Sequence, residues 1–326
     1  MSRRFVIFAA IIVAEPLLAK LGEEPDYGVA GAPWFTGPLL APSSNVIPVG
    51  HFGIEPYVFA IANTGSYGNH WQTTSSPTLW NIAQQTLFGV GITQWMSFQL
   101  TTTAYWNYCE GAAHFENGDW YAQFDMQLFR PREKTSFLPT IKFTLRETIP
   151  LGRYRNLQFR NLKTDIGGAG SWISTAALVF GKLSQIRGVH FFSLRMVLSL
   201  NVPTPVNVKG LNVYGGGYGT HGTVYPGIFG VADFAFEYCL SRNWVLAMDV
   251  VGQWNAKSRF SGKAGTLPTS GAAHVGSLAS VEYSLAPAIE YNWDEHIGLI
   301  AGSWFSVAGK NTAKFTSGVI ALSYYH

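Results

Sequence analysis

The sequence has few charged residues and, beyond its N-terminus, no apolar run that approaches the ~20 residues of a membrane-spanning helix. Charged residues make up 13% of the 326 residues, against roughly 25% in soluble domains, while hydrophobic residues make up 47%. Apolar content of this kind without a helical span favours a transmembrane β-barrel, with a soluble β-sandwich as the alternative. The net charge of +3 is too small to indicate a nucleic-acid partner, and we expect none.

Reactive groups are also sparse. The two cysteines, Cys109 and Cys239, fall at opposite ends of predicted strands, beyond the ~7 Å Cα separation of a disulfide, so we expect two free thiols. None of the eight histidines stands at metal-ligand spacing from another histidine or a cysteine. None is followed two positions later by serine, the arrangement of outer-membrane lipid hydrolases, which are the least favoured alternative. We therefore expect no enzyme activity, no catalytic residue, no metal and no cofactor.

Three regions follow from the order of residue types along the chain. Residues 1–19 have the pattern of a secretory signal peptide, because Arg3 and Arg4 precede an apolar stretch that is too short to span a membrane. Residues 20–51 form an extended N-terminal lead-in, rich in glycine, proline and alanine and without a fold of its own. Residues 52–326 are predicted to form a single β-barrel.

The clearest strand signal lies in residues 228–254, where two alternating runs flank a short polar link at 241–243. Apolar side chains such as Phe234 and Leu246 stand at even positions, and acids such as Asp233 and Asp249 stand at odd positions. A period of two indicates strands, and the short link indicates a hairpin. One continuous apolar face and one polar face are typical of strands that face lipid on one side and a lumen on the other.

Similar segments along the chain predict an all-β protein, a transmembrane antiparallel barrel of about twelve strands. The predicted strands are 52–62, 83–93, 95–108, 119–129, 138–149, 171–183, 189–201, 228–240, 244–254, 277–292, 296–307 and 315–325. Links after odd-numbered strands are the longer ones, including 63–82 and 308–314, and most links after even-numbered strands are tight. Short periplasmic turns and long extracellular loops are typical of the outer membrane of Gram-negative bacteria, with both termini on the turn side. The orientation of 171–183 stays open, because both of its faces are apolar.

Tryptophan placement agrees with this layout. Amphipathic rings favour the headgroup level of a membrane, and seven tryptophans fall near strand ends and predict two belts. They are Trp95, Trp244 and Trp293 on the turn side, and Trp106, Trp120, Trp172 and Trp254 on the loop side.

Inward-facing charges are the main chemical content of the predicted lumen. By alternation, six acids and three bases point inward: Asp125, Asp233, Glu237, Asp249, Glu282, Glu290, Lys142, Arg146 and Arg195. Two interpretations remain open, because buried charges must be paired or hydrated. The charges line a water-filled path, in which case Asp233, Glu237 and Asp249 favour cations, or they pair into a network that fills a narrow barrel.

Basic residues cluster in two extracellular loops. The first cluster is Arg153, Arg155, Arg160 and Lys163, and the second is Lys257, Arg259 and Lys263. Arginine and lysine recognise phosphate well, so contact with lipopolysaccharide phosphates is one interpretation and a merely solvated surface is the other. Outer-membrane lipids, lipopolysaccharide and a small-molecule solute are the expected partners.

Two motifs carry a resemblance to a known group. The run Ile149-Pro150-Leu151-Gly152-Arg153-Tyr154, followed by Asp165-Ile166-Gly167-Gly168-Ala169-Gly170 and Trp172, resembles outer-membrane proteins of the phenol meta-pathway type, distant relatives of long-chain fatty-acid transporters. At Val202-Pro203-Thr204-Pro205 the chain lacks the glycine that this group often has. The C-terminal run Leu322-Ser323-Tyr324-Tyr325-His326 resembles a signal for the barrel-assembly machinery but ends in histidine rather than phenylalanine.

The resemblance implies passage of small hydrophobic compounds and supplies no catalytic residues. The sequence therefore predicts an outer-membrane channel or porin-like transporter for small molecules, hydrophobic or aromatic ones among them. A structural or surface-interaction barrel with a filled lumen is the alternative.

Overall fold

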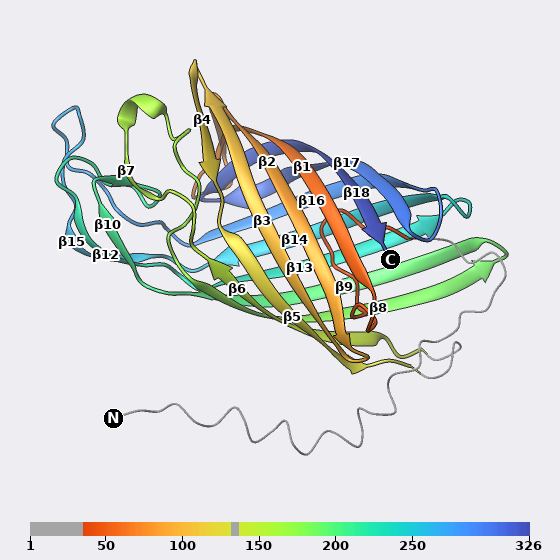
Figure 1. The fold of residues 1–326 in the computed structure, drawn as a ribbon. Coiled ribbons are helices and arrows are strands. Elements are labelled where there is room, and N and C mark those ends of the chain that lie inside the picture. Colours follow the sequence, from red (N-terminus) through yellow and green to blue (C-terminus); the bar gives the residue numbers. More distant parts are fainter. Residues whose placement is uncertain (1–34, 132–136) are drawn as a thin grey trace, which may run out of the picture.

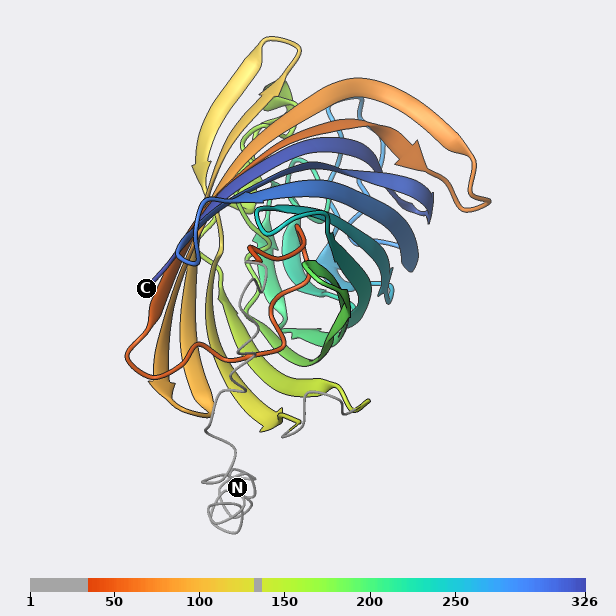
Figure 2. The same cartoon turned by 90° about the vertical axis from the view of Figure 1, so that its right-hand side faces the viewer.

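The computed structural model describes residues 35–131 and 137–326 and shows a closed antiparallel β-barrel of twelve strands, as predicted (Figures 1 and 2). The barrel strands are β1 (Phe52–Tyr67), β2 (Thr73–Thr93), β3 (Met96–Cys109), β5 (Trp120–Phe129), β6 (Thr140–Ile149), β8 (Ile173–Arg187), β9 (His190–Pro203), β13 (Phe229–Cys239), β14 (Trp244–Asn255), β16 (Ser280–Asn292), β17 (Ile297–Lys310) and β18 (Thr312–Tyr325). Pairing of β1 with both β2 and β18 closes the cylinder. The predicted signal peptide, 1–19, and residues 20–34 of the lead-in lie outside the described residues.

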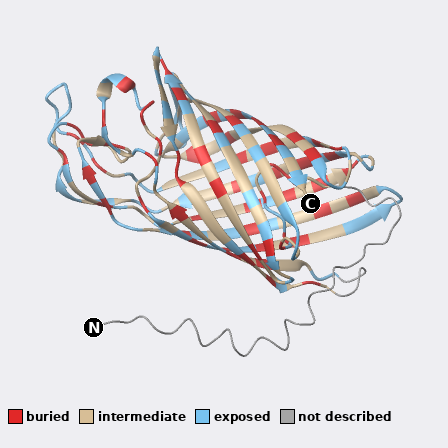
Figure 3. Ribbon diagram, viewed as in Figure 1, coloured by how far each residue is buried: buried red, intermediate tan, exposed pale blue. Residues whose placement is uncertain are grey.

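Successive residues of the strands alternate between an outer and an inner face (Figure 3). In β14 the side chains of Leu246 and Val250 are each 43% exposed on the outer face, whereas Asp249 is completely buried. Strand β8 follows the same rule and so acquires the orientation that its sequence left open: Leu178 is exposed and Val179 is buried. The outer surface is therefore apolar because lipid, not water, is its solvent.

The tryptophans lie at the two rims of this apolar surface. Trp106, Trp172 and Trp254 are exposed near the loop end of the barrel, and Trp244 and Trp293 are exposed at the turn end. Trp95 and Trp120 are half-buried.

The long polar link predicted at 63–82 is wrong. Instead, β1 and β2 continue as a paired hairpin as far as Tyr67 and Thr73, and Trp71 at its tip stacks on Tyr283 of β16. Residues 73–77 are exposed. A hairpin in water needs no contrast between its two faces, so the alternation that identifies lipid-facing strands is missing from this part of the sequence.

The link predicted at 308–314 is also shorter than expected. β17 and β18 are separated only by Asn311, whose φ of 52° lies in the left-handed region that asparagine tolerates. Ladder pairing of the outer end of β18 with β1 extends to Thr312. The remaining long loops stay long and contain short elements of their own.

These short elements lie at the loop end of the barrel (Figure 1). β4 (Ala112–Asn117) pairs with the outer end of β3, and β7 (Arg155–Leu157) pairs with β11 (Leu211–Asn212). A three-stranded sheet contains β10 (Val206–Lys209), β12 (His221–Tyr225) and β15 (Arg259–Lys263). One 3₁₀ turn, η1 (Phe159–Asn161), follows β7.

No helix in the described part of the chain is long and apolar enough to cross a membrane. Both cysteines are buried and free, as predicted from their positions at opposite ends of the barrel.

Candidate functional site: a lumen crossed by the N-terminal segment

The described part of the predicted lead-in lies inside the barrel. Residues 35–48, here called the luminal segment, cross the interior in Figure 2 as a red trace surrounded by the strands. The segment begins beside Cys239 and Val245 near the turn side, where Phe35 packs against both. It reaches the level of Asp249 near the middle of β14 and returns to Gly91, close to the turn between β2 and β3. The segment therefore forms a bent strap across the turn-side half of the lumen.

Two of the predicted inward acids hold the strap by its backbone. The Glu290 carboxylate accepts hydrogen bonds from the N–H groups of Thr36, at 2.8 Å, and Gly37, at 3.3 Å. Asp249 Oδ1 accepts one from the N–H of Ala41 at 3.0 Å. The segment has no helix and no ladder partner at these positions, so the carboxylates supply the acceptors that its buried backbone needs.

Arg195 connects the strap to a third acid. Its guanidinium lies 3.0 Å from Glu237 Oε2, and it also donates a hydrogen bond of 3.2 Å to the carbonyl oxygen of Ala41. Glu237 is completely buried, and the Arg195 side chain is 13% exposed. The buried Glu237 carboxylate is tolerated because the positive charge of Arg195 compensates it.

The opposite wall holds the other end of the strap through Gln127 of β5. Its Oε1 accepts a hydrogen bond of 3.1 Å from the N–H of Val46, and its Nε2 donates one of 3.1 Å to the carbonyl oxygen of Ser44. Gln127 is 1% exposed. Gln127 was not among the predicted site residues. It is one of several inward polar residues, and nothing in the sequence indicates that its partner is a backbone segment some 80 residues earlier.

Glycines in the wall make room for the strap. A Cβ at Gly91 would stand 1.8 Å from the carbonyl oxygen of Pro48, and a Cβ at Gly181 would stand 2.6 Å from the Cβ of Ser44. Both distances are shorter than any van der Waals contact, so only glycine permits the approach. The wall is therefore shaped for the strap and not for an empty lumen.

Apolar side chains of the strap also pack against the barrel wall. Leu39 is 3% exposed and packs in one cluster with Phe59, Ile300 and Val319. Ala41 packs with Val179, Val197 and Ala235. Burial of this kind stabilises by roughly 25 cal/mol per Å² of apolar area, so the strap is held by packing as well as by hydrogen bonds.

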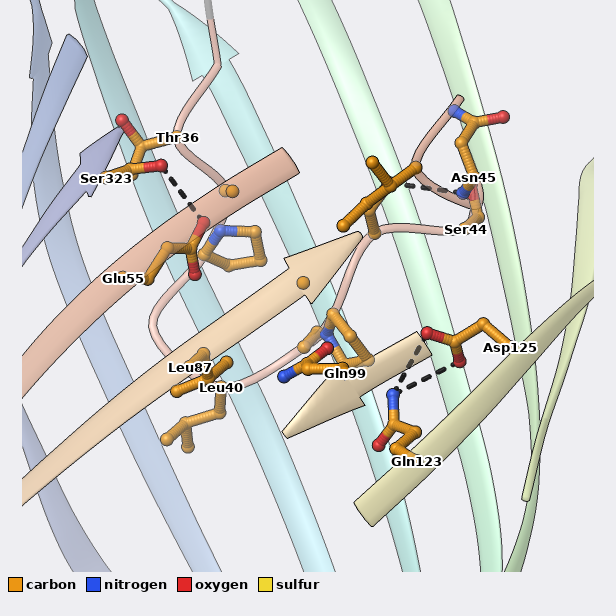
Figure 4. A pocket seen from close by; sticks show the side chains of 18 of the residues that line it. Thr36, Leu40, Ser44, Asn45, Glu55, Leu87, Gln99, Gln123, Asp125 and Ser323 are labelled. Carbon is orange, nitrogen blue, oxygen red and sulfur yellow. Dashed lines mark hydrogen bonds between the residues drawn. The ribbon is translucent and has the colours of Figure 1, made fainter. Parts of the chain in front are cut away.

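A cavity of about 990 Å³ remains between the strap and the wall. Figure 4 shows its lining, with Leu40 of the strap near Leu87 and Gln99 of the wall. The lining mixes apolar and polar side chains. Glu55, which the sequence analysis missed, accepts a hydrogen bond of 3.0 Å from the Ser323 hydroxyl at this cavity.

The remaining predicted lumen residues have three different settings. Lys142 lies 3.4 Å from Asp125, and Arg146 stacks over the ring of Tyr121 at 5.2 Å; these side chains line the cavity. Asp233 is 6% exposed and lies beside the strand that carries Asp249. Glu282 lies toward the loop end, where it accepts a hydrogen bond from Thr312, so the structure does not bring it to the strap or the cavity.

The proposed cation preference of Asp233, Glu237 and Asp249 stays a prediction. Glu237 pairs with Arg195, and Asp249 accepts a backbone hydrogen bond from the strap. A solute that passes this level therefore meets these two acids already engaged with partners.

The predicted lipopolysaccharide-contact residues lie at the loop end, but in different settings. Arg153 is engaged within the loops, at 3.8 Å from Glu116 and 3.7 Å from Asp165. Arg155 donates to the carbonyl oxygen of Asn207 on β10. All seven are exposed, and the other five are Arg160 on η1, Lys163 after it, Lys257 before β15, and Arg259 and Lys263 on β15.

Comparison with known proteins supports the fold. No protein-family model and no curated protein matches the sequence. A solved outer-membrane channel from Pseudomonas putida F1 superposes with a TM-score of 0.65 over 87% of this chain and 98% of its own, at 12% identity. The NanC porin covers 83% of this chain and 98% of its own at 8% identity, and a mutant of the monoaromatic hydrocarbon channel TodX covers 91% and 96% at 10% identity. Both have a TM-score of 0.42, and no argument rests on them.

Proposed function

We propose that the protein is a channel of the Gram-negative outer membrane that passes small molecules, with hydrophobic or aromatic compounds as its substrate class. The observation that carries the proposal is the cavity between the strap and the wall, which Leu40 and Leu87 line beside Gln99 and Lys142. Sites for small molecules combine apolar side chains with polar groups that fix orientation, and both kinds of side chain line this cavity. The likeness in fold to an outer-membrane channel supports the channel, and the resemblance to proteins of the phenol meta-pathway type supports the substrate class.

The strap also favours a second candidate, a structural barrel with a filled lumen. Its backbone is bonded to Glu290, Asp249 and Gln127. The two candidates differ in what the lumen does when the strap is present: a channel admits ions and solutes past it, and a filled barrel admits neither. We place the channel first because the cavity is larger than the packing defects of a filled interior.

Conductance of the full chain in a planar lipid bilayer tests the proposal. We expect small steps from the full chain, and steps several times larger from the double variant Asp249→Ala, Glu290→Ala, because the strap loses two of its anchors. Glu282→Ala is the matched control, since this inward acid touches neither the strap nor the cavity. Silence from both the full chain and the folded double variant would instead establish the filled barrel.

Binding of 1-naphthol tests the substrate class. Quenching of tryptophan fluorescence should report binding by the full chain in detergent, and Leu40→Glu should weaken it at least tenfold because it places a charge in the apolar lining. Leu278→Glu is the control, because Leu278 is 62% exposed in the loop before β16 and does not line the cavity. Equal binding by the full chain and by Leu40→Glu would show that 1-naphthol does not bind in this cavity.

A further inference from the structure

Two of the extracellular loops have an unusual charge composition. Residues 203–228 and 255–279 contain no aspartate and no glutamate, and they carry four lysines or arginines together with two histidines. These loops build the three-stranded sheet of β10, β12 and β15. Loops exposed to water normally mix both signs of charge, so the absence of acids leaves the bases of this sheet without ordinary partners.

The sheet has one buried and one exposed face. Val206, Val208 and Val224 are each at most 2% exposed, and they pack against Val275 with Tyr154 and Tyr214 beside them. Alternation along the strands therefore places Lys209, His221 and Lys263 on the opposite face, where all three are exposed.

The strand register brings the bases of the exposed face into one row. Lys209 of β10 stands directly opposite His221 of β12, and His221 stands directly opposite Lys263 of β15. Directly opposed residues have Cβ atoms only about 4.5–5.5 Å apart, so Lys209 and Lys263 flank the His221 imidazole closely enough for all three side chains to contact one anion. The next row on this face contains Asn207, Thr223 and Ser261, and the third pairs Tyr225 with Arg259.

No acid relieves this row. Among the residues that the structure describes, Lys209, Arg259 and Lys263 form no ion pair. The middle row offers hydroxyl and amide donors instead. Within this row the Thr223 hydroxyl donates a hydrogen bond to the Asn207 side chain directly opposite. The face is thus basic and rich in hydrogen-bond donors, which is the chemistry that recognises phosphate groups.

The position of the face decides which phosphates it meets. β10 follows β9, β12 leads into β13, and β15 follows β14, so the order β10-β12-β15 repeats the order β9-β13-β14 of the barrel wall. In Figure 1 the sheet lies at the left-hand end as a continuation of that wall. Its buried face is covered by the loop residues Tyr154 and Tyr214, so the exposed face points away from the barrel axis.

Arg259 stands five residues beyond Trp254, the exposed tryptophan at the loop-side rim of β14. The exposed face therefore begins just above the apolar surface, at the level of lipid headgroups.

We propose that the exposed face of the β10–β12–β15 sheet binds the phosphate groups of lipopolysaccharide in the surrounding outer leaflet. Arg259 takes a phosphate near the membrane surface, and Lys209, His221 and Lys263 together take a second one further out. Bound phosphate supplies the negative charge that these loops lack. Only part of this face was visible in the sequence, because Lys209 and His221 join Lys263 through strand register and not through spacing along the chain.

Lipopolysaccharide binding by the refolded full chain tests the proposal. The triple variant Lys209→Gln, Arg259→Gln, Lys263→Gln removes three charges from the face. The matched control, Arg187→Gln, Arg242→Gln, Lys314→Gln, removes three charges from exposed positions that lie outside the sheet and outside both predicted lipopolysaccharide-contact clusters. Each protein is placed in phosphatidylcholine vesicles with increasing lipopolysaccharide, and the temperature at which the unboiled gel band converts to the unfolded band is measured.

We expect lipopolysaccharide to raise the conversion temperature of the full chain and of the control. The sheet variant should need at least tenfold more lipopolysaccharide for the same rise. Dephosphorylated lipopolysaccharide should leave the full chain unchanged. Equal responses of the sheet variant and the full chain would overturn the proposal, as would an equal loss in the control variant. An equal rise with inorganic phosphate alone would also overturn it, because the face would then take free anions and not the lipid.

Discussion

At the scale of single residues, the inner face of the barrel depends on matched partners for buried charge. Arg195 serves Glu237 and the carbonyl oxygen of Ala41 at once. Arg195→Met should cost about 3–5 kcal/mol, because removal of one member of a buried pair leaves the other charge uncompensated. The measurement is unfolding in denaturant, followed by loss of the compact gel band. Adding Glu237→Gln should restore part of the loss, and a double variant no more stable than the single one would contradict this account.

The sequence predicted that these residues face inward but not what they hold. Alternation fixes the side of a strand on which a residue lies, so Asp249, Glu237 and Glu290 were identified from their own strands. The strap partners of Asp249 and Glu290 are 208 and 254 positions away along the chain, and Glu237 is linked to the strap only through Arg195. The strap has no periodicity of its own, because its backbone bonds to side chains and not to a ladder.

At the scale of strands, the two faces of the barrel differ in the solvent that they meet. Leu198 and Ser199 are neighbours on β9 at nearly the same depth; Leu198 is 42% exposed toward lipid, and Ser199 faces inward. Leu198→Arg should destabilise by up to about 2–4 kcal/mol, whereas Ser199→Arg should cost much less. Folding into lipid vesicles across a urea series measures both. Similar penalties for the two variants would mean that the assignment of faces is wrong.

The same contrast explains which elements the sequence could predict. Strands that separate lipid from lumen alternate strongly, and their positions were predicted closely. The outer part of the β1–β2 hairpin and the sheet of β10, β12 and β15 were not predicted, because the hairpin lies in water and the sheet is built from strands of four or five residues. Strands of that length carry too few residues to show a period.

At the scale of the whole molecule, the position of the strap decides how open the lumen is. A Cβ at Gly298 would lie 3.3 Å from the Cβ of Thr36, close to the ~3.8 Å of a disulfide, once the Asn292 side chain, whose Oδ1 would lie 2.3 Å away, rotates aside. The variant Thr36→Cys, Gly298→Cys should therefore form a disulfide that fixes the strap to β17. Its single-channel conductance should be lower than that of the full chain and should recover on reduction with dithiothreitol. Gly298→Cys alone is the control, and conductance that does not respond to reduction, although the disulfide has formed, would show that the strap does not limit passage.

The strap also constrains the order in which the molecule can assemble. It immediately precedes β1, and β1 closes the cylinder against β18, the final strand of the chain. Residues 35–48 are thus made before any of the wall that surrounds them, yet the lumen that they occupy exists only after the last strand has docked. They must either wait against the inner face of an open sheet or enter a finished cylinder through its turn-side mouth. The moment at which residues 35–48 become resistant to protease during folding would therefore report when the barrel closes around them.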